Sequence, residues 1–339
     1  MTPFLSRWWL PPPDDLSRSL AFGGMPPSLF GFVRRVSLWS QLSISLLAIG
    51  VFILNTVPLE LQRRILNATV VDGNIRLILA LTVVYAVTVM VEGLIKLVMN
   101  VYRGWVTEKA VRALRLSTSA LVDSLPDQRG KAGVQGVEIS LILDEPEPIG
   151  AFVGVAFSEF VLQLGILLSV FGYMFYLQPL LAVVSLAMFS PQFVFVPLMQ
   201  RAINRRVQSR IGVLRQASVG VLLVGAHEVQ RELQQELHFA EIFQLNLGIF
   251  KLRYSMKFLM NLTQNFGKAV ILGAGGWYIV NGEAEVGTVV AFISGLNNLA
   301  DPWRDLVTWF QDMMVTSAKY QVYVTAMKKF AAGEDPAVV

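Results

Sequence analysis

The chain has 339 residues, of which 54% are hydrophobic and only 15% charged, and its mean hydropathy is +0.55. Soluble domains carry about 25% charged residues, so the composition argues against an ordinary soluble enzyme and favours a membrane protein. The absence of cysteine excludes disulfide scaffolds, zinc–thiolate sites, iron–sulfur clusters and cysteine nucleophiles. The two histidines leave little for a histidine-based metal site, and a net charge of +4 is modest for a nucleic-acid-binding protein.

Residues 1–35 contain six of the fifteen prolines and lack an apolar run of the length that a signal peptide requires. We therefore expect residues 1–35 to form a cytoplasmic N-terminal arm. Within it, the sequence SLFGFVRRV (28–36) predicts a short interfacial helix that places Arg34 and Arg35 at the lipid surface.

Six later segments are long and apolar enough to cross a bilayer, which takes about 20 residues. They cover approximately 38–58, 75–101, 149–177, 180–199, 258–280 and 286–307, the last with a polar continuation toward Phe330. The sequence thus predicts an all-α membrane protein, with a six-span domain over 36–330 and a cytoplasmic tail over 331–339.

The connections after spans one, three and five are short (59–74, 178–179 and 281–285), whereas those after spans two and four are long (102–148 and 200–257). Basic residues concentrate in the long connections. The first holds Arg103, Lys109, Arg112, Arg115, Arg129 and Lys131, and the second holds Arg201, Arg205, Arg206, Arg210, Arg215, Arg231, Lys251, Arg253 and Lys257. The positive-inside rule then places both long connections and both termini in the cytoplasm. We expect a multi-pass membrane protein, which in a bacterium would lie in the plasma (inner) membrane.

The long connections have the composition of helices. Residues 103–125 and 201–254 contain few helix breakers, so both predict membrane helices that continue into the cytoplasm and are joined to their partners by short turns. Two such hairpins on one side of the membrane indicate rigid levers that are driven from the cytoplasm.

Three sequence stretches, met in order along this topology, resemble the transmembrane domain of exporter-type (type-1) ABC transporters. The first is LPDQRGKAGVQGVEISLILDE (125–145), which is similar to the first intracellular turn of that family, and the second is 221–243, which is similar to the region of the second turn. The third is NGEAEVGTVVAFISGLNNLADPWRDLV (281–307), which resembles the outer turn and the sixth helix. The resemblance covers about 33–330.

The resemblance implies six long helices per chain that assemble as a homodimer, or as a heterodimer with a similar chain, with helices four and five crossing to the partner. It also implies that the two intracellular turns form coupling helices, near 126–132 and 221–228, that dock on an ATP-binding subunit. The residues carried over are Pro126, Asp127, Gln128 and Arg129 in the first turn, and Val221, Leu222, Gly225, His227 and Glu228 in the second.

No phosphate-binding loop is present. That loop requires G-x-x-x-x-G-K-[S/T], but the two Gly-Lys pairs, at 130–131 and 267–268, are each followed by alanine and lack the first glycine. An LSGGQ-like signature is missing too, and the chain ends near the position at which fused members begin their ATPase domain. We therefore expect a permease subunit that is not itself an enzyme and binds no cofactor, with ATP and Mg²⁺ held by a partner ATPase subunit.

Several charged residues fall inside the predicted spans, where ionisable groups usually face the bundle interior. They are Glu92, Lys96, Glu159, Lys268, Asp301, Arg304 and Asp305. Two interpretations stay open for them: a polar lining of the transport pathway, or structural ion pairs such as the i, i+4 pair Glu92 and Lys96. Gly150 and Gly154 form a G-x-x-x-G pattern that suits close helix packing.

Two other functions are compatible with the same scaffold. One is an ATP-independent transporter driven by protons through Glu92, Glu159 or Asp301, and the other is a membrane scaffold or regulator that transports nothing. The polarity of the sixth span permits a lipid, a peptide or a drug-like amphiphile as substrate and selects none of them.

Overall fold

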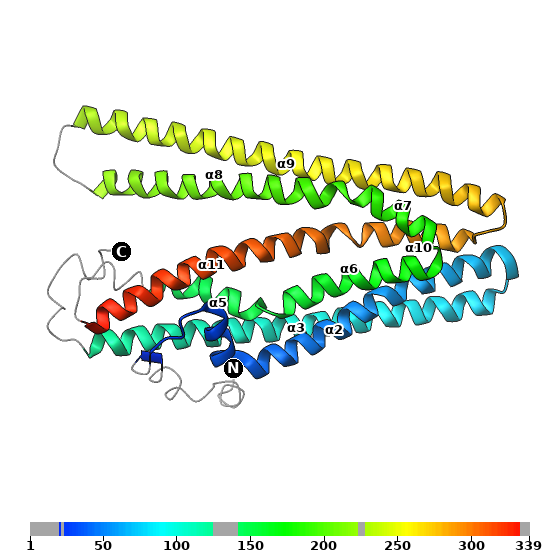
Figure 1. The fold of residues 1–339 in the computed structure, drawn as a ribbon, viewed down its shortest axis with the longest axis horizontal. Coiled ribbons are helices and arrows are strands. Elements are labelled where there is room, and N and C mark those ends of the chain that lie inside the picture. Colours follow the sequence, from blue (N-terminus) through cyan, green and yellow to red (C-terminus); the bar gives the residue numbers. More distant parts are fainter. Residues whose placement is uncertain (1–19, 22–23, 125–141, 223–227, 333–339) are drawn as a thin grey trace. The chain divides into compact units, whose positions relative to one another are not determined.

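The computed structural model describes residues 20–21, 24–124, 142–222 and 228–332, and all regular structure in these ranges is helical. The predicted all-α class is therefore confirmed (Figure 1). The helices are α2 (Leu29–Asn67), α3 (Ile75–Asp123), α5 (Pro146–Val155), α6 (Ser158–Leu177), α7 (Pro179–Phe189), α8 (Pro191–Leu222), α9 (Glu228–Val280), α10 (Val286–Asn297) and α11 (Ala300–Ala332), with a π-helix, η1 (Ala68–Asp72), after α2.

Four helical stretches are long and apolar enough to cross a membrane: Leu29–Val70, Ile75–Asp123, Ser158–Leu177 and Pro179–Leu214. They contain the first, second and fourth predicted spans and the later part of the third, and they give the chain the character of a membrane protein. The predicted fifth span lies at the end of α9, where Gln264, Asn265 and Lys268 lower the hydropathy. The predicted sixth span is divided between α10, which has only 12 residues, and the start of α11.

The predicted turns between spans agree with the helix boundaries. The α6 helix ends at Leu177 and α7 begins at Pro179, with Gln178 in an extended conformation between them. The α9 helix ends at Val280 and α10 begins at Val286. Gly282 in that turn has φ +73°, a left-handed conformation that glycine adopts without the steric cost of a side chain.

Two expectations were wrong. Residues 59–74 are not simply a loop, because α2 continues to Asn67 and η1 follows it before Gly73 reverses the chain. The predicted third span is not one helix either, because Ala156 and Phe157 separate α5 from α6. Both differences arise from contacts between distant helices, which are described below.

The predicted continuation of the second span beyond the membrane is confirmed as regular helix. The α3 helix runs unbroken for 49 residues. Only 6% of the residues in its most apolar stretch of 18 are buried. Its buried residues lie mostly in the C-terminal half, from Met99 to Leu121. The two ends of α3 therefore have different surroundings: an apolar, exposed first half and a packed second half.

The chain forms two compact units. The first comprises Met1–Pro58, Thr82–Ser169 and Thr308–Val339, and the second comprises Leu59–Leu81 and Val170–Val307. In the first unit, α3 and α11 are joined by the Tyr323 hydroxyl, which contacts Thr118 Oγ1 and lies 3.3 Å from the Leu114 carbonyl oxygen. Burial raises the pKa of the Tyr323 phenol to about 12, so this hydroxyl stays protonated.

The α5 helix packs closely on the second half of α3. A Cβ atom at Gly154 would lie 2.8 Å from the Arg103 carbonyl oxygen and would overlap Thr107 Oγ1, and one at Gly150 would overlap the Val111 side chain. The G-x-x-x-G pattern therefore marks a close helix contact, which its spacing allows but does not by itself predict.

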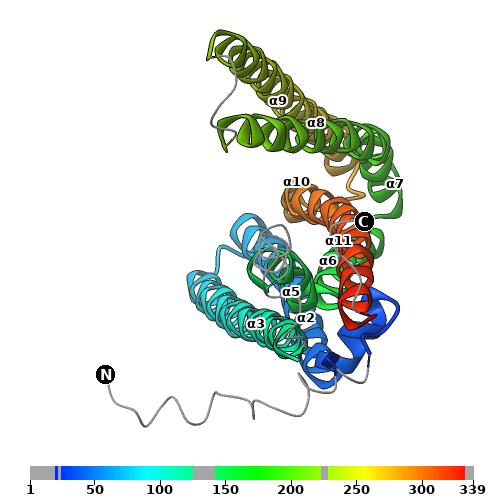
Figure 2. The same ribbon diagram turned by 90° about the vertical axis from the view of Figure 1, so that its left-hand side faces the viewer.

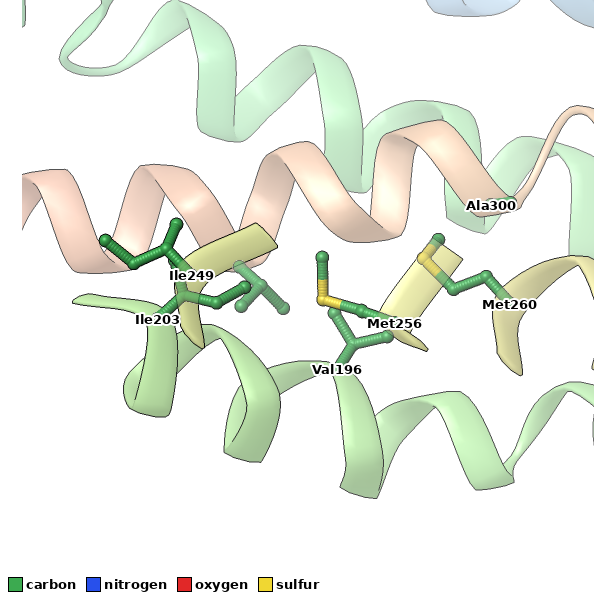
Figure 3. Packing of buried hydrophobic residues seen from close by; sticks show 7 residues of the cluster. Val196, Ile203, Ile249, Met256, Met260 and Ala300 are labelled. Atoms are coloured by element: carbon green, nitrogen blue, oxygen red, sulfur yellow. The ribbon is translucent and has the colours of Figure 1, made fainter. Parts of the chain in front are cut away.

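In the second unit, α8 and α9 lie side by side as a long hairpin (Figures 1 and 2). Its core is made by aliphatic and methionine side chains of α8 and α9 together with two residues at the start of α11 (Figure 3). These are Val196, Ile203, Ile249, Met256, Met260, Ala300 and Val307.

The start of α2 is a short helical segment, as the sequence predicted for 28–36, and its interfacial position stays a prediction. Ser37 has φ −142° and ψ 20°, which interrupts the helical conformation and separates residues 29–36 from the rest of α2. The Ser37 hydroxyl donates to the Val33 carbonyl oxygen, 3.0 Å away. The short first segment and the apolar span are thus separated by a kink at Ser37.

We predict that Gly154→Ala destabilises the protein by about 1–3 kcal/mol, because an added methyl group there forces α5 away from α3. Thermal unfolding of the purified protein in detergent measures the loss. Gly172→Ala in α6 is the matched control, since no atom lies within 4 Å of a Cβ built there. Equal midpoints for the two variants would contradict the close packing of α5 on α3.

Candidate functional site

The break between α5 and α6 is held open by side chains from other helices. In a continuous helix the Val153 carbonyl would accept the Phe157 amide. Instead, Gln41 of α2 takes both: its Nε2 donates to the Val153 oxygen at 2.5 Å, and its Oε1 accepts from the Phe157 nitrogen at 3.4 Å. Trp309 of α11 donates from Nε1 to the Ala156 carbonyl oxygen at 3.1 Å. Such replacement partners are what allow a helix to break at membrane depth.

A buried ion pair lies at the same place. Glu159, in the first turn of α6, pairs with Arg103 of α3, with 2.7 Å between Arg103 Nη1 and Glu159 Oε2. Their side chains are only 10% and 19% exposed. Arg103 Nε donates to Ser158 Oγ at 3.0 Å, and Gln163 Nε2 donates to Glu159 Oε1 at 2.5 Å. We call Gln41, Arg103, Ser158, Glu159 and Gln163 the broken-helix site.

An aromatic cluster around Trp309 lies beside the break between α5 and α6. The Trp309 ring lies 5.2 Å from Phe160, 5.0 Å from Phe310 and 6.2 Å from Phe152, measured between centroids. The low exposure of the Arg103 and Glu159 side chains strengthens the attraction between their charges. One guanidinium nitrogen, Arg103 Nη2, is buried without a hydrogen-bond partner in the described structure.

The chemistry of this site is binding and positioning. The site consists of a carboxylate, a guanidinium, two side-chain amides and a hydroxyl. None of these groups has the features of an activated nucleophile. What the site provides is a charged connection between α3 and α6 at a point where the backbone of α5 and α6 can bend. Separating the pair would leave two buried charges unpaired, which costs several kcal/mol.

Glu92 and Lys96 form the ion pair that their spacing predicts. Lys96 Nζ lies 2.6 Å from Glu92 Oε1, and Asn55 Nδ2 of α2 donates to the same oxygen at 3.2 Å. Glu92 is buried, whereas the Lys96 side chain is 41% exposed. The pair is therefore self-neutralising and also attaches α3 to α2 within the first unit.

Glu60, just after Pro58 in α2, is the centre of a second cluster, which lies in the second unit. Its carboxylate is 2.9 Å from Arg63 Nε and 2.6 Å from Arg64 Nε, and it accepts the Tyr173 hydroxyl of α6 at 2.7 Å. Arg63 Nη1 also lies 2.7 Å from Glu285 Oε2. We call these five residues the Glu60 cluster; it joins the ends of α2 and α6 to the start of α10.

The Glu60 cluster explains one glycine of the sequence motif. Asn67 Nδ2 donates to the Glu285 carboxylate, and Asn67 Oδ1 accepts the Gly287 amide at 2.9 Å. A Cβ atom at Gly287 would overlap the Arg63 carbonyl oxygen. The glycine of the V-G-T sequence is thus required by the close approach of α10 to α2.

The remaining predicted pathway residues lie in the second unit. Arg304 Nη1 is 3.0 Å from Asp301 Oδ1 and its Nη2 is 3.4 Å from Asp305 Oδ1, and all three side chains are at least 42% exposed. Lys268, on α9, is half-buried, and no ion pair joins it to another described residue.

The predicted coupling turns fall largely outside the described residues. Pro126, Asp127, Gln128 and Arg129 of the first turn lie outside them, as do Gly225 and His227 of the second. Val221 and Leu222 end α8, and Glu228 begins α9. The second turn is therefore the short connection of the α8–α9 hairpin.

Sequence reasoning missed Arg103, Gln41 and Trp309. Arg103 follows the apolar stretch of the second span and was placed on its helical extension outside the membrane, so no partner inside a span was expected for it. One signal in the sequence could have indicated this site. Gln41 and Gln163 are polar residues inside predicted spans one and three, and polar residues inside a span usually face other helices rather than lipid.

Compared with known proteins, the chain matches no family model and no curated protein.

We predict that Arg103→Gln destabilises the protein by about 3–5 kcal/mol, because it leaves the Glu159 carboxylate buried without its cation. The double variant Arg103→Met, Glu159→Leu should recover most of this loss, since it removes both charges. The thermal midpoint in detergent is the readout.

Arg304→Gln is the control, because it removes the cation from an exposed ion-pair cluster, in which each pair is worth about 1 kcal/mol or less. A loss for Arg103→Gln no larger than that for Arg304→Gln, or no recovery in the double variant, would contradict the importance of the buried pair.

Proposed function

We propose that the chain is the transmembrane permease subunit of an exporter-type ABC transporter. In this proposal six spans move a substrate by alternating access, and ATP hydrolysis takes place on a separate ATP-binding subunit. The observation that carries the proposal is the length of the helices, taken together with the resemblance of the turns that join them.

The α3 and α9 helices are far longer than a bilayer needs. At 1.5 Å per residue, the 49 residues of α3 and the 53 residues of α9 correspond to about 73 and 80 Å. The hydrocarbon core of a bilayer is about 30 Å thick. Both helices therefore have several turns outside the membrane, on the side that the basic residues assign to the cytoplasm.

The α8–α9 hairpin has the stiffness that a lever needs. Arg206 Nη1 donates to the Gly248 carbonyl oxygen at 3.2 Å, and Arg210 Nη1 donates to Asn246 Oδ1 at 3.3 Å. Together with the apolar core of Figure 3, these contacts hold the two helices along the part that leaves the membrane. A force applied at residues 221–228 would be transmitted to the membrane-spanning part.

The cytoplasmic part of α9 also supports assembly with a second chain. Large apolar side chains are exposed along it, namely Leu237, Phe239, Phe243, Phe250 and Tyr254. An apolar stripe outside the bilayer favours a protein partner. A second copy, or a similar chain, is the partner that the resemblance implies.

A proton-driven transporter is the second candidate, favoured by the two buried carboxylates Glu92 and Glu159. Each is paired with a cation in the structure, as is expected of charges that join helices inside a bundle. Transport by proteoliposomes separates the candidates: an ATP-driven permease needs its ATPase and ATP, whereas a proton-driven one stops when an uncoupler is added.

We predict that the purified chain in nanodiscs hydrolyses no ATP, and that co-expression with its ATP-binding subunit, sought among the neighbouring genes, yields a complex with ATPase activity. Replacing residues 221–228 with a Gly-Ser sequence of equal length should abolish docking, because it removes the helix-joining turn. Docking that persists when 126–132 and 221–228 are both replaced would overturn the proposal.

We predict that Phe243→Asp combined with Phe250→Asp reduces co-purification of two differently tagged copies at least tenfold, because buried interface anchors typically contribute about 2 kcal/mol or more each. Gln244→Asp is the control, since it adds the same charge at an exposed polar position of α9. Unchanged pairing in the double variant would contradict an interface along this stripe.

A further inference from the structure

An apolar groove of about 310 Å³ lies between the start of α2 and the C-terminal half of α11. Its lining residues are Phe30, Met313, Met314, Ser317, Ala318 and Gln321. The walls are fixed, because the Tyr320 hydroxyl donates to the Pro26 carbonyl oxygen at 2.8 Å and Gln321 Nε2 donates to the Pro27 carbonyl oxygen at 2.6 Å. The groove belongs to the first unit, where α2 and α11 lie side by side.

The sequence around the groove places it at the level of lipid headgroups. Phe30 precedes the interruption at Ser37, and the apolar span begins immediately afterwards. Trp39 is 81% exposed, and Leu42 and Leu46 are exposed on the following turns. Tryptophan at the end of an exposed leucine stripe is typical of a helix that enters a bilayer at that residue.

A cation accompanies the groove. Arg34 lies four residues after Phe30 and therefore on the same face of the helix. Its side chain is exposed and has no ion-pair partner among the described residues. The adjacent Arg35 differs, because its Nη1 donates to the Gly24 carbonyl oxygen at 3.2 Å. Arg34 is thus the cation that can bind an external anion.

We propose that this groove is a binding site for an anionic phospholipid. One acyl chain lies against Phe30, Met314 and Ala318, and the phosphate group pairs with Arg34. Methionine side chains adapt their shape to flexible apolar ligands, and a guanidinium binds phosphate through two parallel hydrogen bonds. A free phosphate ion would leave the apolar groove empty, so the combination selects a lipid. The proposal requires membrane insertion but not the proposed coupling to an ATPase.

Native mass spectrometry of the full chain tests the site, with phosphatidylglycerol and phosphatidylcholine of identical acyl chains added in detergent. The wild-type chain should retain one phosphatidylglycerol in preference to phosphatidylcholine. Arg34→Gln should weaken phosphatidylglycerol binding about fivefold, the effect of one arginine at a membrane surface, and Arg34→Lys should keep most of the binding. Ala318→Trp should reduce retention of both lipids by filling the groove.

Two control variants make the same change in charge, or add the same ring, at positions away from the groove. Arg205→Gln removes an exposed arginine of α8, and Val315→Trp adds a ring to an exposed position of α11 that does not line the groove. Both should retain lipid as the wild type does. Ala318→Leu replaces Ala318→Trp if the latter does not fold. Equal retention of the two lipids by the wild type, or retention unchanged by Arg34→Gln or by filling the groove, would overturn the proposal.

Discussion

The ion pair between Arg103 and Glu159 is the interaction on which the arrangement of the first unit depends. It connects α3 to α6 beside the break that Gln41 and Trp309 hold open. A bilayer supplies no water to replace these partners, so charges and backbone groups at this depth must be satisfied within the protein. The close approach of α5 to α3 at Gly154 is compatible with this geometry, because the glycine leaves room for Arg103's own backbone.

The same requirement shapes the second unit in a different way. The Glu60 cluster ties the ends of α2 and α6 to the start of α10, whereas the α8–α9 hairpin is held mainly by apolar packing along its length. In the second unit, specific polar contacts therefore join the ends of helices, whereas apolar packing joins α8 and α9 along their length. In a permease that switches between two states, the ends would be the places where contacts are exchanged, and the shafts would move as rigid bodies.

The sequence predicted the helix boundaries best where local chemistry decides them. Pro179 and Gly282 fix their turns through backbone preferences that need no distant partner. The break at Ala156 could not be predicted, because the residues that stabilise it, Gln41 and Trp309, are more than 100 positions away in the chain. Arg103 was missed for a related reason: a charged residue that follows an apolar stretch is expected to lie outside the membrane until its partner on another helix is known.

The candidate site was found only in part. Glu159 was named among the charges inside the predicted spans, but no partner on another helix was predicted for it. Glu92 and Lys96 were paired correctly because their spacing of four residues is sufficient within one helix. The Glu60 cluster was overlooked because residues 59–74 were expected to form a loop, although Glu60 with Arg63 and Arg64 is the spacing of a charged helix face.

The proposed permease function depends most directly on the number and direction of the membrane spans. Because the chain contains no cysteine, single introduced cysteines can report both. Single cysteines introduced as Asn74→Cys, Asp127→Cys, Gly225→Cys and Glu283→Cys can be labelled with a membrane-impermeant maleimide in vesicles of known orientation. A six-span permease predicts labelling of positions 127 and 225 only from the cytoplasmic side, and of positions 74 and 283 only from the opposite side. Labelling of position 283 from the cytoplasm, or of 127 and 225 from opposite sides, would contradict it.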